Sequence, residues 1–221
     1  DIQRSRGLGD VYKRQLFDVN SAAEKCKHKI GDKWEAFANF WRTTQLEYTW
    51  LRSLMKRHKD FWQITEDSLD KSMNVFNIDT SMKNELLNLY KVLSPYPEVK
   101  EVLTDLKKKN LKLAILSNGT PDLINELVNT NKLDTTFDDL FSIEEVKIYK
   151  PDSRVYDLPV NKYKIQPKEV VFLSANTWDV SGGGNFGYNA VWVNRNNSHF
   201  DNLDYKPKKE IKNLKGLLEI V

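Results

Sequence analysis

Six polar side chains in three short segments of this 221-residue chain are of types that together could bind a small anion. The lysine among them offers a point charge to a carboxylate or phosphate group, and the aspartate could orient that lysine or a water molecule. Each segment alone is typical of a surface turn, so a site forms only where the fold joins all three. The six residues are Ser117, Asn118, Lys150, Ser174, Asn176 and Asp179.

Two of these segments directly follow short apolar runs. Val170 to Leu173 is rich in β-branched and aromatic residues, which predicts a buried strand that stops at Ser174. The run 113–116 likewise predicts a strand that ends at Ser117. Because ligands of open α/β sheets bind at the carboxyl ends of the strands, we expect the polar residues to meet at one edge.

The rest of the second half alternates between helical and strand patterns. This alternation predicts a doubly wound, Rossmann-like α/β core with a parallel sheet. The expected elements are a turn at 94–100, helices at 99–106, 121–129 and 155–163, the last disturbed by Pro159, a strand or turn at 141–146, and a glycine-containing crossover from 174 to a strand at 190–193. A polar tail then ends in a short apolar segment, 214–221.

The region from residue 21 to about residue 90 has helical periodicity throughout. It predicts a helical block that interrupts the α/β pattern. The block is rich in aromatic residues, most of which should pack between helices. Before it, Leu16 to Asn20 is typical of the exit from a strand into a helix, with Asn20 or Ser21 as the N-cap.

Charge and composition argue against several classes of protein. The formal net charge is +3, and the lysines are scattered or lie in short runs without a stripe or binding motif, so no nucleic-acid partner is expected. No apolar run approaches the roughly 20 residues of a membrane span. The single cysteine, Cys26, cannot form an internal disulfide, which favours a cytoplasmic protein.

Three motifs together carry a family resemblance. LSNGTPDLI, YKPDSRVYDL and VVFLSANTWDVSGGGNFG resemble, in this order and spacing, the L-2-haloacid dehalogenases, the type II branch of the haloacid dehalogenase superfamily. In the helical block, FWRTTQLEYTWLRSLM and FWQIT resemble that family's cap domain. The resemblance implies a cap at 21–94, inserted after the first strand of a core made of 16–20 and 95–221.

The resemblance also implies an activity, hydrolysis of a carbon–halide bond. An aspartate on the first strand attacks a small L-2-haloacid, and water then releases a D-2-hydroxyacid from the aspartyl ester. This is nucleophilic catalysis by a carboxylate. The resemblance implies no metal or other cofactor, a 2-haloacid as the small-molecule partner, and a possible homodimer.

Residue roles follow from the resemblance. Arg42 would pair with substrate and help the halide leave, while Ser117 and Asn118 would hold the substrate carboxylate. Lys150, with Tyr156 nearby, would stabilise the charge of the nucleophile. The nucleophile, the lysine and the hydrolytic water would be positioned by Ser174, Asn176 and Asp179. The apolar wall of the pocket would be formed by Leu46, Phe61 and Trp178.

The first strand departs from the family pattern FDxYGTLFDV. Here the chain has DVYKRQLFDVN, and alignment on Leu16 places the nucleophile at Val11 and the threonine at Gln15. Asp10 is one residue early, and such a slip turns a strand side chain to the opposite face. DVYKRQ also matches the translation of a sequencing adapter. We therefore interpret residues 1–15 as a non-native leader that replaces the first core strand and lacks its apolar run; the alternative is a genuine basic leader.

Two other functions remain open from the sequence. A magnesium-dependent phosphatase of the same superfamily would need further acids beside Asp179 in the last loop, because magnesium prefers oxygen ligands. A catalytically dead protein that binds small anions fits the displaced aspartate. Activity gained by restoring the aspartate separates an enzyme from a binding protein.

Overall fold

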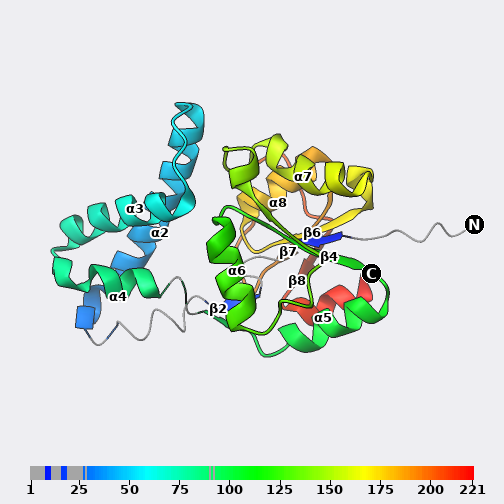
Figure 1. The fold of residues 1–221 in the computed structure, drawn as a ribbon, viewed down its shortest axis with the longest axis horizontal. Coiled ribbons are helices and arrows are strands. Elements are labelled where there is room, and N and C mark those ends of the chain that lie inside the picture. The colour runs from blue at the N-terminus through cyan, green and yellow to red at the C-terminus, as the bar shows by residue number, and fades with distance from the viewer. Residues whose placement is uncertain (1–7, 11–15, 19–26, 28, 90, 92) are drawn as a thin grey trace, which may run out of the picture.

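The computed structural model describes residues 8–10 and 18 in their backbone, and residues 16, 17, 27, 29–89, 91 and 93–221. Its centre is a six-stranded parallel sheet in the order β5-β4-β1-β6-β7-β8 (Figure 1). The order changes direction at β1, so the sheet is doubly wound, as the alternating pattern predicts. The strands are β1 (Leu8–Asp10), β4 (Lys112–Ser117), β5 (Asp139–Ser142), β6 (Val170–Ser174), β7 (Asn189–Val193) and β8 (Lys209–Ile211).

The central strand β1 differs from the expectation that the first residues could not supply a strand. The backbone of Leu8–Asp10 pairs in parallel with β4 on one side and β6 on the other. Two flanking strands supply ladder partners for this segment, which compensates for its weak strand propensity. Farther along, β2 (Phe17–Asp18) pairs with β3 (Ser94–Pro95). Val11, Gln15, Asn20, Ser21 and Cys26, to which the sequence predictions refer, lie outside the described residues.

Helices cover both faces of the sheet because side chains alternate along each strand. Leu113 and Ile115 of β4 contribute to one buried cluster, whereas Ala114 and Leu116 contribute to another. The first cluster packs under α5 (Val99–Lys108), α6 (Pro121–Thr130) and the 3₁₀ turns of Leu214–Glu219. The second packs under α7 (Ser153–Tyr163) and α8 (Thr177–Phe186), on the opposite side in Figure 1.

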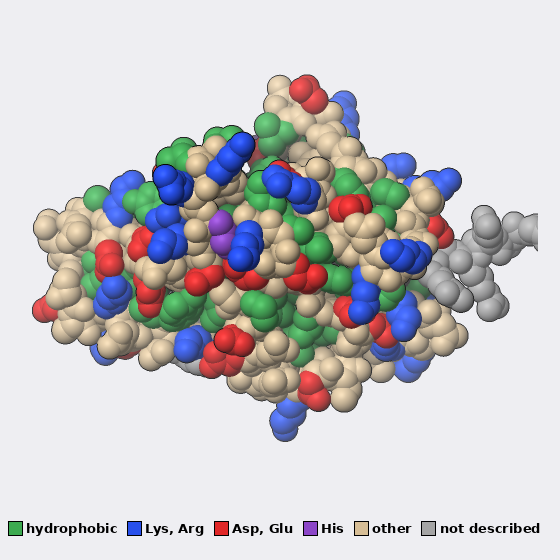
Figure 2. Space-filling model, turned by 45° about the horizontal axis from the view of Figure 1, so that its top comes forward, with side chains coloured by type: hydrophobic (Ala, Val, Ile, Leu, Met, Phe, Trp, Pro, Cys, Tyr) green, Lys and Arg blue, Asp and Glu red, His purple; other side chains and the backbone are tan. Residues whose placement is uncertain are grey.

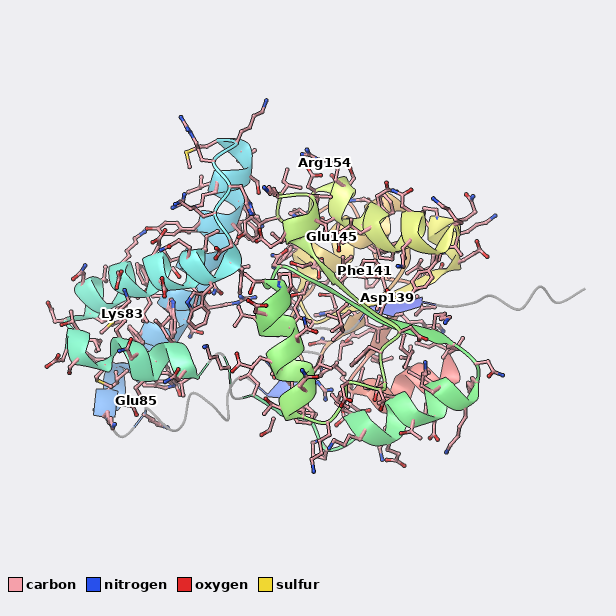
Figure 3. The ribbon with its side chains drawn as sticks, viewed as in Figure 1. Lys83, Glu85, Asp139, Phe141, Glu145 and Arg154 are labelled. Carbon is pink, nitrogen blue, oxygen red and sulfur yellow. The ribbon has the colours of Figure 1, made fainter. Side chains whose placement is uncertain are left out.

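A separate helical layer lies beside the sheet (Figure 1). It contains α2 (Trp34–Leu54), α3 (Phe61–Phe76) and α4 (Lys83–Asn88), and its own core includes Trp34, Phe37 and Leu69. Lys83 and Glu85 on α4 mark this layer in Figure 3, well separated from Asp139 and Phe141 on the edge strand β5. The described part of the predicted helical block is therefore helical.

The structure refines three local predictions. Helix α7 continues through Pro159, which removes only one backbone donor and is itself buried. The predicted glycine crossover contains a regular helix, α8. The polar tail contains an edge strand, β8, which pairs with β7.

The surface carries charges of both signs. Figure 2 shows lysine and arginine side chains interspersed with aspartate and glutamate over the face it presents, with no single-sign stripe on that face. No helix among the described residues combines the length and the apolar character that a membrane crossing requires.

Candidate active site

The polar residues converge where the strands on either side of β1 end. β4 ends at Ser117 and β6 ends at Ser174, and both run parallel to β1. Both serines are fully buried. The carboxyl ends of neighbouring parallel strands meet at one edge of the sheet, so this is the topological switch point at which open α/β sheets bind ligands.

A buried ion pair forms the centre of this edge. The Nζ atom of Lys150 lies 3.3 Å from Oδ2 of Asp179, and the two side chains are 5% and 7% exposed. A buried pair needs hydrogen bonds to its remaining polar atoms. Asp179 obtains them from Ser174, whose Oγ is 2.9 Å from Oδ2, and from Tyr156, whose hydroxyl is 2.7 Å from Oδ1. Both carboxylate oxygens are thus occupied.

Aromatic rings lie around the lysine. Its Nζ atom is 4.9 Å from the centroid of the Phe172 ring and 5.7 Å from that of Tyr156. Ring faces attract a cation, most strongly where water is excluded. The charge of Lys150 is therefore stabilised by one carboxylate and two ring faces in a buried environment.

Helix α8 explains the position of the acid. Asn176 is the N-cap, and Asp179 lies in the first turn of the helix. A carboxylate is favoured there by the partial positive charge of the helix N-terminus. The backbone N–H of Asn176 donates to Ser174 Oγ over 3.2 Å, which connects the strand end to the helix start. Trp178, one residue before the acid, lies in the same first turn.

The loop after β4 is held toward Lys150. Oδ1 of Asn118 accepts a hydrogen bond from the backbone N–H of Lys150 over 3.3 Å. Ser117 Oγ accepts one from the N–H of Gly119 over 2.7 Å, and Ser142 donates to the Gly119 carbonyl. These bonds fix the turn that follows Ser117 and bring it beside the lysine segment.

The helical layer contributes the other wall. Trp50 of α2 makes an edge-to-face contact with Trp178, with the ring centroids 5.5 Å apart. Phe61, at the start of α3, belongs to the buried cluster of the core, and its ring centroid is 6.4 Å from that of Tyr149. Arg42 and Leu46 are also placed by α2, so the sheet edge alone does not position them. Sequence reasoning did not single out Trp50, although it follows Leu46 by one helical turn.

Tyr149 is a second residue that sequence reasoning did not single out. Its hydroxyl donates to the Lys59 carbonyl over 2.6 Å, and its backbone N–H donates to Ser53 Oγ over 3.2 Å. Burial, with smaller contributions from the negative charges of Glu144 and Asp60, raises the pKa of the Tyr149 hydroxyl well above its ordinary value. The Tyr149 hydroxyl therefore stays protonated and can donate a hydrogen bond. The sequence signal that could have identified Tyr149 was its position directly before Lys150.

A close approach at Gly182 brings Tyr156 to Asp179. A Cβ atom at Gly182 would lie 2.5 Å from the Tyr156 hydroxyl and 2.7 Å from Cβ of Pro151. We expect Gly182→Ala to lower the free energy of unfolding by about 1–3 kcal/mol, the usual range for overpacking, as measured by urea denaturation. In a Tyr156→Phe background the nearest clash is gone, so the cost should fall; an equal cost in both backgrounds would contradict this explanation.

The first strand places Asp10 short of this edge. Asp10 is level with Ala114 and Phe172, three residues before Ser117 and two before Ser174. At about 3.3 Å per residue, its Cα lies roughly 7–10 Å below the polar edge, measured along the strands. The described part of β1 therefore ends below the polar edge.

Within the described ranges, no group of three or more histidine, cysteine, aspartate or glutamate side chains is arranged to hold a metal ion.

Comparison with protein families gives a match over residues 32–193 to the model described as haloacid dehalogenase-like hydrolase. Among curated proteins, (S)-2-haloacid dehalogenase 1 of Pseudomonas sp. (strain CBS-3) is 42% identical over 184 residues, which is 82% of this chain and 81% of the relative. The (S)-2-haloacid dehalogenase of Pseudomonas sp. (strain YL) is 38% identical over 207 residues, 93% of this chain and 89% of the relative.

Solved structures show the same similarity. A dehalogenase crystal structure superposes with a TM-score of 0.95 at 34% identity, over 100% of this chain and 99% of the other. The L-2-haloacid dehalogenase from Xanthobacter autotrophicus, with chloropropionic acid covalently bound, has a TM-score of 0.89 at 29% identity, over 97% of each chain.

Proposed function

This chain belongs to the haloacid dehalogenase-like hydrolases, and we propose that its site hydrolyses the carbon–halide bond of small L-2-haloacids to D-2-hydroxyacids. The observation that carries the proposal is the buried cluster of Lys150, Asp179, Ser174 and Tyr156 at the carboxyl end of β6, the strand next to the central strand. Relatives named (S)-2-haloacid dehalogenases, and a neighbour that holds chloropropionic acid covalently, support the substrate class.

The reaction divides one difficult displacement into two steps. A carboxylate oxygen of an aspartate on the first strand attacks C2 of the substrate; the new C–O bond forms as the carbon–halogen bond breaks, with inversion at C2. Water then attacks the carbonyl carbon of the aspartyl ester. Its oxygen remains in the regenerated carboxylate, and the hydroxyacid leaves with the oxygen that the aspartate supplied.

The cluster supplies the electrostatics of both steps. Lys150 stabilises the nucleophile's negative charge, and its own charge is partly balanced by Asp179. Because Tyr156 and Ser174 donate to Asp179, the acid stays in place beneath the lysine. Asn176, at the start of α8, completes the set that positions the nucleophile and the hydrolytic water. Preorganised groups of this kind are worth most where water is excluded.

Substrate recognition uses the two layers together. Ser117 and Asn118, in the buried turn after β4, bind the substrate carboxylate. Arg42 on α2 pairs with the substrate and assists halide departure. The apolar substituent is enclosed by Leu46, Phe61 and Trp178; contact between Trp50 and Trp178 supports this wall.

The helical layer acts as a cap. We assign residues 21–94 to the cap and residues 16–20 and 95–221 to the core, to which β1 (Leu8–Asp10) also belongs. Bonds from Tyr149 to Ser53 and Lys59 join the layers, as does His58, whose Nε2 is 2.9 Å from Oε2 of Glu144. These contacts surround the segment that carries Lys150, which supports closure of the cap over the site.

A homodimer and a cytoplasmic location complete the proposal. The single cysteine favours the cytoplasm. Three apolar side chains toward the end of α2 are exposed and could contact a second copy of the chain. They are Leu51 (50% exposed), Leu54 (79%) and Met55 (60%). Sedimentation velocity should give a dimer that Leu54→Glu dissociates; a monomer at all concentrations would contradict the dimer.

The chain has Val11, not aspartate, at the family's nucleophile position, so the test restores an aspartate there. Halide release from L-2-chloropropionate, without added metal, is measured for this chain and for a repaired chain. In the repaired chain an apolar strand replaces residues 1–15, with aspartate at position 11 and glycine and threonine at positions 14 and 15. The D-enantiomer is the control. We expect the repaired chain to act on the L-enantiomer alone.

Other results would redirect the proposal. Absence of halide release from both folded chains would contradict dehalogenation, and phosphate release with magnesium would then favour a phosphatase. Binding of the haloacid by the repaired chain without turnover would favour a protein that only binds small anions.

A further inference from the structure

Arg42 lies in a stretch of α2 that is bonded at two points to one threonine of α3, and one of these two residues also bonds to Arg42. Its Nη1 atom donates to Oε1 of Gln45 over 2.7 Å. The Nε2 atom of Gln45 in turn donates to Thr65 Oγ1 over 2.6 Å. Trp41, the residue before Arg42, donates its indole N–H to the Thr65 carbonyl over 3.1 Å. Thr65 on α3 thus fixes the stretch of α2 that carries the arginine.

The direction of these hydrogen bonds is determined by Thr65. Its hydroxyl donates to the carbonyl of Phe61 over 2.7 Å, one turn earlier in α3. With its only proton used in this way, the hydroxyl can act only as an acceptor toward Gln45. The amide group of Gln45 must therefore point Nε2 at Thr65 and Oε1 at Arg42.

Burial makes this arrangement rigid. Gln45 and Thr65 are both fully buried between α2 and α3. A buried amide that lost a partner would bear a desolvation cost, so the pair holds its geometry. The acceptor facing Arg42 is also neutral. A carboxylate at position 45 would orient the guanidinium equally well but would neutralise its charge.

We infer that Gln45 and Thr65 are positioning residues, which aim the guanidinium of Arg42 at the anionic substrate and the departing halide through a neutral acceptor. The inference rests on the proposed function, in which Arg42 meets the substrate. It adds that the aim of Arg42 is set from α3, through a side chain that does not touch the substrate. Phe61, whose carbonyl anchors the series, also forms the pocket wall.

The test compares Thr65→Val with two controls. Valine keeps the shape of threonine and removes the hydroxyl, whereas Thr65→Ser keeps the hydroxyl. Ser72 is the matched control, because it is also fully buried on α3 and donates to the carbonyl four residues earlier over 2.7 Å. Ser72→Ala therefore removes a comparable bond from the same helix, away from Arg42. Gln45→Glu tests the charge.

Two measurements separate positioning from stability. Calorimetry of this chain gives the Kd of L-2-chloropropionate, which should rise about tenfold for Thr65→Val and more for Gln45→Glu, as expected when a charged group is misplaced or neutralised. In the repaired chain, the ratio of kcat for L-2-bromopropionate to that for the chloro compound should rise several-fold in both variants. Chloride is the poorer leaving group and depends more on Arg42. Thr65→Ser and Ser72→Ala should change neither quantity.

The inference fails if Thr65→Val lowers the Tm as Ser72→Ala does and leaves both the Kd and the kcat ratio unchanged. It also fails if Thr65→Ser does not preserve them. If the unsubstituted chain does not bind the haloacid and its repaired form does not release halide, the proposed function itself is overturned.

Discussion

Placing an aspartate at position 11 is expected to raise halide release by at least about a thousandfold, the scale on which loss of a nucleophile acts. The repaired chain described above should show this gain over the present chain. The physical reason is that the present Asp10 lies too far from the polar edge of the sheet. Asp10 is level with Ala114 and Phe172, below the edge at which Ser117 and Ser174 end their strands.

Two controls locate the reacting carboxylate. Changing the introduced aspartate to asparagine should return the repaired chain to the level of the present one, whereas Asp10→Asn in the present chain should have little effect. In a single turnover with excess protein in heavy-oxygen water, the label should enter that aspartate, where peptide mass spectrometry finds it. If Asp10→Asn abolished release from the present chain, Asp10 would be the nucleophile and the register argument would be wrong.

Replacement of Lys150 by methionine in the repaired chain is expected to lower kcat by about a hundred- to a thousandfold, as for other preorganised electrostatic groups. Methionine keeps most of the volume and removes the charge. Stability should fall as well, by about 3–5 kcal/mol, because Asp179 becomes a buried charge without its cation. Stopped-time halide assays and urea denaturation measure the two effects on one preparation.

A second substitution separates these effects. Asp179→Asn added to Lys150→Met removes the unpaired charge, so much of the lost stability should return. The rate should not return, because the cation that stabilises the nucleophile is still missing. Recovery of both quantities together would mean that Lys150 supports the fold alone, and its proposed catalytic role would be wrong.

Much of the core could be predicted from strand patterns. The apolar runs before Ser117 and Ser174 correspond to β4 and β6, because buried parallel strands need continuous apolar sequence. The convergence of Lys150 with Asp179 followed from the rule that strand ends meet at one edge. Topology thus turned scattered polar residues into a candidate site.

The elements that the sequence patterns did not specify depend on contacts between distant residues. The sequence predicted a glycine-containing crossover without naming a helix in it, and the three glycines lie in α8. A side chain at Gly183 would clash with the ring of Phe172 and one at Gly184 with the ring of Tyr205, so their absence serves packing. β8, with the sequence KEI, has no strand periodicity of its own and takes its conformation from β7. β1 similarly depends on two neighbours.

Tyr149 gives the active site a mechanical property. Its hydroxyl and backbone N–H bond to the helical layer, and the next residue in the chain is Lys150. Movement of that layer away from the sheet would therefore pull directly on the backbone of the lysine. An opening of that layer to admit substrate would in this way also displace the positive charge of Lys150.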